Sequence, residues 1–230
     1  MKTRKTFAFV ALCCCALWAN AQKLTSPDGN LVMDFSLNQK GAPVYELTFK
    51  NKPVIKPSTL GLELKREDPE KRIGFEWTER KDKERVDEKM NLMTGFKVRE
   101  THTSTFDETW MPVWGEYEKV RNHYNELTVT FSQPAKHDRT MIVRFRLFDD
   151  GLGFRYELPE QKTMNYLTVK DELTEFNLTG NHTLYCIPGD YDTNEFAYTT
   201  AAISEVREAM ERNLRKKGYE AKATSFTVQT

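Results

Sequence analysis

The sequence predicts an all-β protein, a large β-sandwich with one short helix near its C-terminal end. Apolar residues alternate with polar ones over many short stretches, and this period of two buries one face of a strand. Turn-forming residues separate the stretches, and a single segment has helical periodicity. Short strands joined by turns, with almost no helix, are typical of two sheets packed face to face.

The predicted strands occupy residues 31–37, 45–49 and 60–64, and then 127–131, 141–147 and 154–158. In each of them large apolar side chains fall on every second position. The last two flank Asp149-Asp150-Gly151, a composition typical of a hairpin turn. The charge-dense interval 79–91 is predicted to be a solvated loop.

The period changes from Ile203 onward, where a helical stripe begins. Its apolar members are Ile203, Val206, Met210 and Leu214. Two pairs of opposite charge stand four residues apart, Glu208 with Arg212 and Glu211 with Arg215, and Gly218 is a suitable stop. Beyond the helix, Phe226–Thr230 reads as a further strand without a partner. An unpaired strand is an unusual terminus, so we expect the chain to be the front part of a longer protein.

Residues 1–21 are predicted to be a signal peptide that is cleaved after Ala21, leaving a β-sandwich domain over residues 22–230. Basic residues near the start are followed by an apolar run and by Ala19-Asn20-Ala21, a small-x-small cleavage site. The run is too short to span a bilayer, and no longer one follows. We therefore expect an exported, periplasmic protein with no membrane attachment after cleavage.

The charge balance, the cysteine content and the missing motifs exclude several kinds of partner and of site. Removing the signal leaves 31 basic residues against 34 acidic ones, a balance that offers no footprint for nucleic acid. Cys186 becomes the only cysteine, so no internal disulfide can form, and we expect it to be a small buried side chain. The histidines are scattered, and no nucleotide-binding, zinc or nucleophile-elbow motif is present.

The segment Ile187–Glu195 begins with a Pro-Gly turn, behind which Asp190, Asp192, Asn194 and Glu195 stand within six residues. Hard oxygen donors on a turn suit Ca²⁺, which takes six to eight oxygen ligands and tolerates irregular geometry. The alternative is a solvated turn in which the Asp and Asn side chains bond to their own backbone.

A second polar and aromatic segment, Phe106–Glu116, places Trp110 and Trp114 among carboxylates. Aromatic faces that stack on sugar rings, beside carboxylates that accept hydroxyl hydrogen bonds, would form a carbohydrate surface. We instead expect both tryptophans to be buried in the sandwich core.

Five segments together resemble the N-terminal domain of glycoside hydrolase family 97, over about Gln22 to Met210. They are Phe106–Trp110, Pro112–Glu116, Arg121–Leu127, Phe148–Tyr156 and Ile187–Glu195. The resemblance is greatest to periplasmic α-glucosidases of starch utilisation. It implies a galactose-mutarotase-like super-sandwich that packs on a catalytic (β/α)₈ barrel, truncated here before the barrel.

The resemblance also implies the chemistry of the parent enzyme, a calcium-dependent α-glycosidase that acts on α-linked oligosaccharides derived from starch. Barrel glutamates bind most of the Ca²⁺ in that family, and Glu195 matches the one ligand that comes from the N-terminal domain. The catalytic carboxyl groups lie in the barrel, so no catalytic residue is expected in this chain. Two other readings stay open: a free-standing carbohydrate-binding module, and a structural sandwich of the cell envelope.

Overall fold

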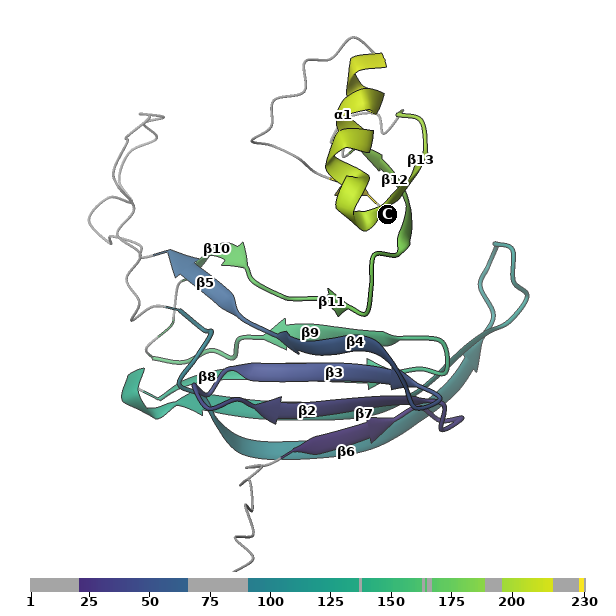
Figure 1. Ribbon diagram of the computed structural model, residues 1–230. Coiled ribbons are helices and arrows are strands. Elements are labelled where there is room, and N and C mark those ends of the chain that lie inside the picture. The colour runs from purple at the N-terminus through teal and green to yellow at the C-terminus, as the bar shows by residue number, and fades with distance from the viewer. Residues whose placement is uncertain are drawn as a thin grey trace, which may run out of the picture. The chain divides into compact units, whose positions relative to one another are not determined.

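The computed structural model describes residues 21–65, 91–136, 138–162, 164, 167–188, 196–216 and 228–229. It confirms an all-β architecture with one short α-helix (Figure 1). The predicted signal peptide up to residue 20 and the predicted loop up to residue 90 lie outside the described residues. The chain divides into two compact units, Met1–Asn177 and Leu178–Thr230.

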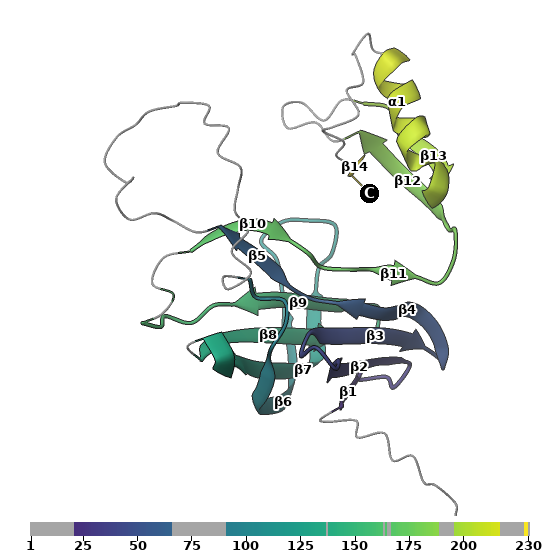
Figure 2. The same ribbon diagram turned by 60° about the vertical axis from the view of Figure 1, so that its left-hand side comes forward.

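The first unit contains two antiparallel sheets that lie face to face (Figures 1 and 2). One has the order β1-β2-β3-β4-β11, with β1 (Gln22–Thr25), β2 (Leu31–Leu37), β3 (Pro43–Phe49), β4 (Lys52–Thr59) and β11 (Asn177–Leu178). The other has the order β6-β7-β8-β9, with β6 (Lys97–Trp110), β7 (Val120–Gln133), β8 (Arg139–Leu147) and β9 (Leu152–Glu157). The short strands β5 (Leu62–Lys65) and β10 (Thr168–Glu172) form a separate pair.

The predicted period of two is what builds the core. Buried and partly exposed residues alternate along most of β2 and along the whole of β8. Phe35 of one sheet lies 5.6 Å, between ring centroids, from both Phe131 and Phe145 of the other. The predicted hairpin turn is confirmed as well, since β8 and β9 pair and the Phe148 N–H donates to the Gly151 carbonyl at 2.8 Å.

Strands β6 and β7 are each 14 residues long and stay paired from Lys97 and Ser132 to Trp110 and Val120. Burial in β7 is lost toward Val120, and the hairpin continues past the ends of the neighbouring strands (Figure 1). Trp110 is 48% exposed and Trp114 is 88% exposed. The prediction that both are core residues is therefore wrong, because the strand register puts Trp110 on the face of the sheet opposite to that of the core residues Leu127 and Val129, and Trp114 lies in the connection between β6 and β7.

The second unit has a small sheet of order β13-β12-β14, with β12 (Thr183–Pro188), β13 (Thr199–Ala202) and β14 (Val228–Gln229). Val228 and Gln229 pair with Pro188 and Ile187 of β12. The expectation of an unpaired last strand is thus wrong, because the edge of β12 opposite β13 receives it.

The predicted helix is present as a 3₁₀ turn (Ile203–Glu205) followed by α1 (Val206–Lys216). Both predicted charge pairs occur, with N–O distances of 3.9 Å for Arg212–Glu208 and 3.4 Å for Arg215–Glu211. The buried face differs slightly from the predicted stripe. The buried residues of α1 are Ala209, Met210 and Asn213. Asn213 is buried because it makes hydrogen bonds beneath the helix, and Leu214 of the predicted stripe is partly exposed.

Candidate functional site

The predicted calcium segment begins in β12, to which Ile187 and Pro188 belong. Glu195 and the other acidic residues of the segment fall in residues 189–195, outside the described residues. What the structure describes is the support on either side. β12 carries the chain in at Pro188, and the chain is described again from Phe196 toward β13.

Helix α1 makes hydrogen bonds to the residues that follow the predicted calcium segment. The Asn213 amide donates to the Ala197 carbonyl at 2.5 Å and to the Thr199 hydroxyl at 2.8 Å. Below these bonds is a small apolar core made of Cys186, Ala201, Ala209 and Met210. The described residues on the two sides of this segment are therefore held by strand pairing and by hydrogen bonds from the helix.

Cys186 belongs to this core, as expected for a small buried side chain. Burial raises the pKa of its thiol, so the thiolate that a soft metal or a nucleophile would require is disfavoured. Residues 189–195 carry carboxylate and amide oxygens in the sequence, the type of donor that Ca²⁺ takes. Elsewhere in the described part of the chain, no group of three or more His, Cys, Asp or Glu side chains could hold a metal ion.

A second feature is a charged network on the outer face of the β6-β7-β8-β9 sheet. Arg144 donates to Glu126 at 2.5 Å and to Glu157 at 2.7 Å and 3.2 Å. Arg146 forms an ion pair with Glu126 and Arg155 forms one with Glu157, each with an N–O distance of 2.8 Å. Hydrogen bonds from Arg144 hold the pKa of Glu157 down to about 2, against the opposing effect of burial. Carboxylates with such low pKa values are poor general acids.

Acid should weaken this network. The folded pKa of Glu157 is below its ordinary value of 4.5, so its contribution to stability is complete above pH 4.5 and is lost as the pH falls toward 2. In urea unfolding, the stability difference between wild type and Glu157→Gln should shrink by on the order of 2 kcal/mol from pH 6 to pH 2.5. Parallel stability curves for the two proteins would contradict this assignment.

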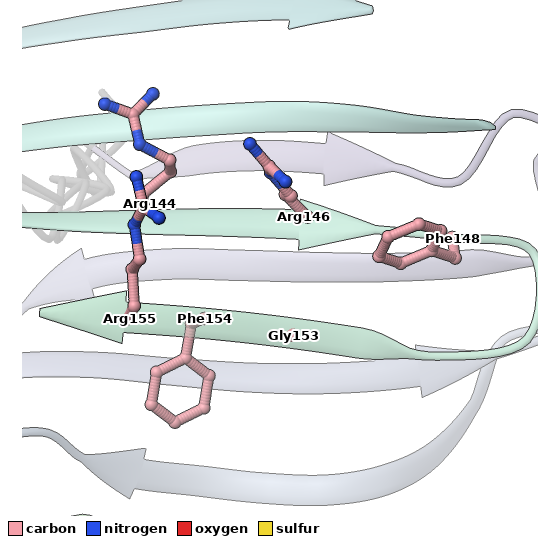
Figure 3. Close-up of a pocket in the computed structure, with 6 residues that line it drawn as sticks. All are labelled: Arg144, Arg146, Phe148, Gly153, Phe154 and Arg155. Carbon is pink, nitrogen blue, oxygen red and sulfur yellow. The ribbon is translucent and has the colours of Figure 1, made fainter. Parts of the chain in front are cut away.

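A hollow of about 210 Å³ opens on the same face, lined by Arg144, Arg146, Phe148, Gly153, Phe154 and Arg155 (Figure 3). A Cβ atom at Gly153 would meet nothing within 4 Å, so the missing side chain leaves this space open. The three arginines lie on one side of the strands, whereas the Phe154 ring points to the other side (Figure 3). The hollow therefore offers guanidinium donors beside the Phe148 ring. The nearby carboxylates of Glu126 and Glu157 are already ion-paired with Arg144.

The sequence signal for this network was present but incomplete. Arg144 and Arg146 alternate with the core residues Val143 and Phe145, which identifies them as outward-facing. Their partner Glu126 stands on the neighbouring strand, opposite Arg146. Only the register between strands brings these charges together, and a one-residue change in register would separate them.

No helix in the described part of the chain combines the length and apolarity needed to cross a bilayer.

The profile of the family described as Glycosyl-hydrolase 97 N-terminal matches residues 24–230. A retaining alpha-galactosidase from Bacteroides thetaiotaomicron is 26% identical over 214 residues, which are 88% of this chain and 28% of that protein.

Solved structures give the same picture. A glycoside hydrolase family 97 enzyme from Pseudoalteromonas sp. strain K8, in complex with panose, is 33% identical over 78% of this chain and 24% of its own, with a TM-score of 0.64. The enzyme from that strain in complex with acarbose is 32% identical over 82% of this chain and 25% of its own, with a TM-score of 0.65. This chain therefore spans about a quarter of the length of the relatives that it matches.

Proposed function

Because this chain belongs to the N-terminal domain family of glycoside hydrolase 97 enzymes, we propose that it is the accessory domain of an exported calcium-dependent α-glycosidase. The observation that carries the proposal is the family match over nearly the whole chain, together with relatives about four times as long. On this proposal its partner is a catalytic (β/α)₈ barrel of the same polypeptide. The protein is exported to the periplasm, with the signal peptide removed after Ala21.

The proposed substrate is an α-linked oligosaccharide of the starch type, and the parent enzyme is of the α-glucosidase type. The relative that was solved with panose supports this choice, because panose is such an oligosaccharide. The alpha-galactosidase relative has the lower identity. Hydrolysis of an aryl α-glucoside against an aryl α-galactoside by the full-length protein distinguishes the two substrates.

In the proposed site Glu195 is an anchor for calcium. Bound Ca²⁺ would polarise the glycosidic bond that is cleaved. Glu195 contributes a charged oxygen ligand, and Asn213 with the end of β12 restrains the chain on both sides of it. One carboxylate binds Ca²⁺ only weakly, so the remaining ligands have to come from the barrel.

This proposal predicts an inactive fragment. The 230-residue chain should hydrolyse no aryl α-glucoside, with or without Ca²⁺, because the catalytic carboxyl groups belong to the barrel and the neighbouring carboxylates Glu126 and Glu157 are ion-paired. The polypeptide encoded by the complete reading frame should be active and should lose activity in a chelator. Calcium-dependent turnover by the purified fragment would contradict the assignment of catalysis to the barrel.

The exposure of Trp110 and Trp114 favours a second candidate, a carbohydrate-binding module. Calorimetric titration of the fragment with maltooligosaccharide tests it. Binding that is lost in Trp114→Ala would support this candidate, and the absence of heat would oppose it.

A further inference from the structure

The end of the β6–β7 hairpin exposes a concentration of large apolar side chains. We define the hairpin tip as residues 110–117, which include Trp110, Met111, Val113, Trp114 and Tyr117, all of them exposed. Val113 is 100% exposed. Several large exposed apolar side chains within eight residues are typical of an interaction site.

The apolar character is confined to one face of the hairpin strands that carry the tip. Phe106 and Trp110 lie on the same face as Tyr124, because strand residues two or four apart point the same way and Phe106 is opposite Tyr124. The other face is polar, and there Arg121 donates to both carboxylate oxygens of Asp107, at 2.9 Å and 2.7 Å. The tip thus continues an aromatic surface on one side only.

The aromatic side chains of this surface are closely packed around Tyr124. The rings of Phe106 and Tyr124 stack with centroids 5.3 Å apart, and Phe148 lies 5.2 Å from Tyr124. The Arg146 guanidinium covers the Tyr124 ring at 4.5 Å. Tyr124 is buried by these neighbours. A side chain held in place before binding loses less entropy on binding, so the hairpin is preorganised to present its tip.

The composition of the tip fits a protein surface better than a sugar. Glu116 is its only charged residue. The aliphatic side chains of Met111 and Val113 stand between the tryptophans, whereas sugar sites set aromatic rings beside converging polar groups. Aromatic and methionine side chains with few charges are characteristic of the core of a protein–protein interface.

We propose that the hairpin tip docks on the catalytic domain of the same polypeptide, with Trp114 as the central contact. The inference rests on the proposed function. It is supported by the length of the relatives, in which this chain accounts for only 24–28% of the protein and the remainder is large enough to cover the tip.

Hydroxyl-radical footprinting of Trp114 tests the docking. Its oxidation should be fast in the 230-residue chain and about tenfold or more slower in the full-length polypeptide, as for a residue central to an interface. In the full-length polypeptide, Val113→Glu should restore fast oxidation of Trp114, because it places a charge in an apolar contact. The matched control is Thr109→Glu on the polar face of the same hairpin, which should leave Trp114 protected. Equal melting temperatures of the three 230-residue chains verify that neither change unfolds the domain.

Assays of glycosidase activity on the same samples separate this inference from the proposed function. An active, calcium-dependent full-length enzyme in which Trp114 oxidises as fast as in the fragment would overturn the docking alone. Protected Trp114 in a full-length polypeptide without glycosidase activity would overturn the proposed function and leave an interdomain contact. Protection that appears in the fragment at high concentration would replace the catalytic domain with a second copy of the chain, and protection by maltooligosaccharide would replace it with a sugar.

Discussion

In the full-length polypeptide, Glu195→Gln should weaken Ca²⁺ binding and lower α-glycosidase activity together, each by roughly 10-fold or more. An amide oxygen can still coordinate calcium but brings no negative charge, so the loss is electrostatic and not steric. The fold should be unchanged, because the two side chains have nearly the same shape. Calorimetric calcium titration and a rate assay on wild type and variant measure the two effects.

A matched control comes from the same loop. Asp190→Asn also removes one charge, yet no ligand role is assigned to Asp190, so its effect on calcium affinity should be the smaller. In the 230-residue chain Glu195→Gln should change the free energy of unfolding by less than about 0.5 kcal/mol, as for surface substitutions in general. Equal affinity and equal activity of wild type and variant would show that Glu195 is an ordinary surface residue and that the loop is only a turn.

The β-sandwich could be predicted from the sequence because periodicity reports directly on which residues share a face. The alternation at Met33 and Phe35 and at Val143 and Phe145 names residues that are fully buried or nearly so. Periodicity does not report whether a second layer covers that face. Phe106 and Trp110 stand four residues apart on a strand, as core residues do, but the pairing of Phe106 with Tyr124 puts both on the face opposite to that of the core residues Leu127 and Val129.

The prediction of a calcium ligand depends on a different kind of information. The oxygen-rich segment is visible in the sequence, whereas the choice of Glu195 depends on the resemblance to the family. The hydrogen bonds that Asn213 makes next to this segment could not be predicted, because Asn213 stands outside the apolar stripe that identifies the helix. Its hydrogen bonds to Ala197 and Thr199 depend on how α1 crosses β13, a tertiary relationship that helical period does not encode.

The largest expected effect on stability is at the centre of the sandwich. Phe35→Ala should lower the free energy of unfolding of the first unit by about 3–5 kcal/mol, the usual cost of removing a large buried aromatic side chain. Phe35 is 1% exposed and packs between Phe131 and Phe145 of the opposite sheet, so its removal leaves a cavity that neither sheet can close alone. Urea unfolding of residues 22–230, followed by far-ultraviolet circular dichroism, measures the loss.

Phe49→Ala is the control, since Phe49 ends β3 and is 40% exposed, and it should cost about 1 kcal/mol or less. Equal losses for the two variants would contradict the assignment of Phe35 to the intersheet core. The pair also separates stability from chemistry in the full-length polypeptide. Activity of Phe35→Ala should fall only at temperatures where the first unit unfolds, and added Ca²⁺ should not restore it. Activity of Glu195→Gln should already be low in the folded protein and should recover in part at high Ca²⁺, because mass action compensates for a weakened site.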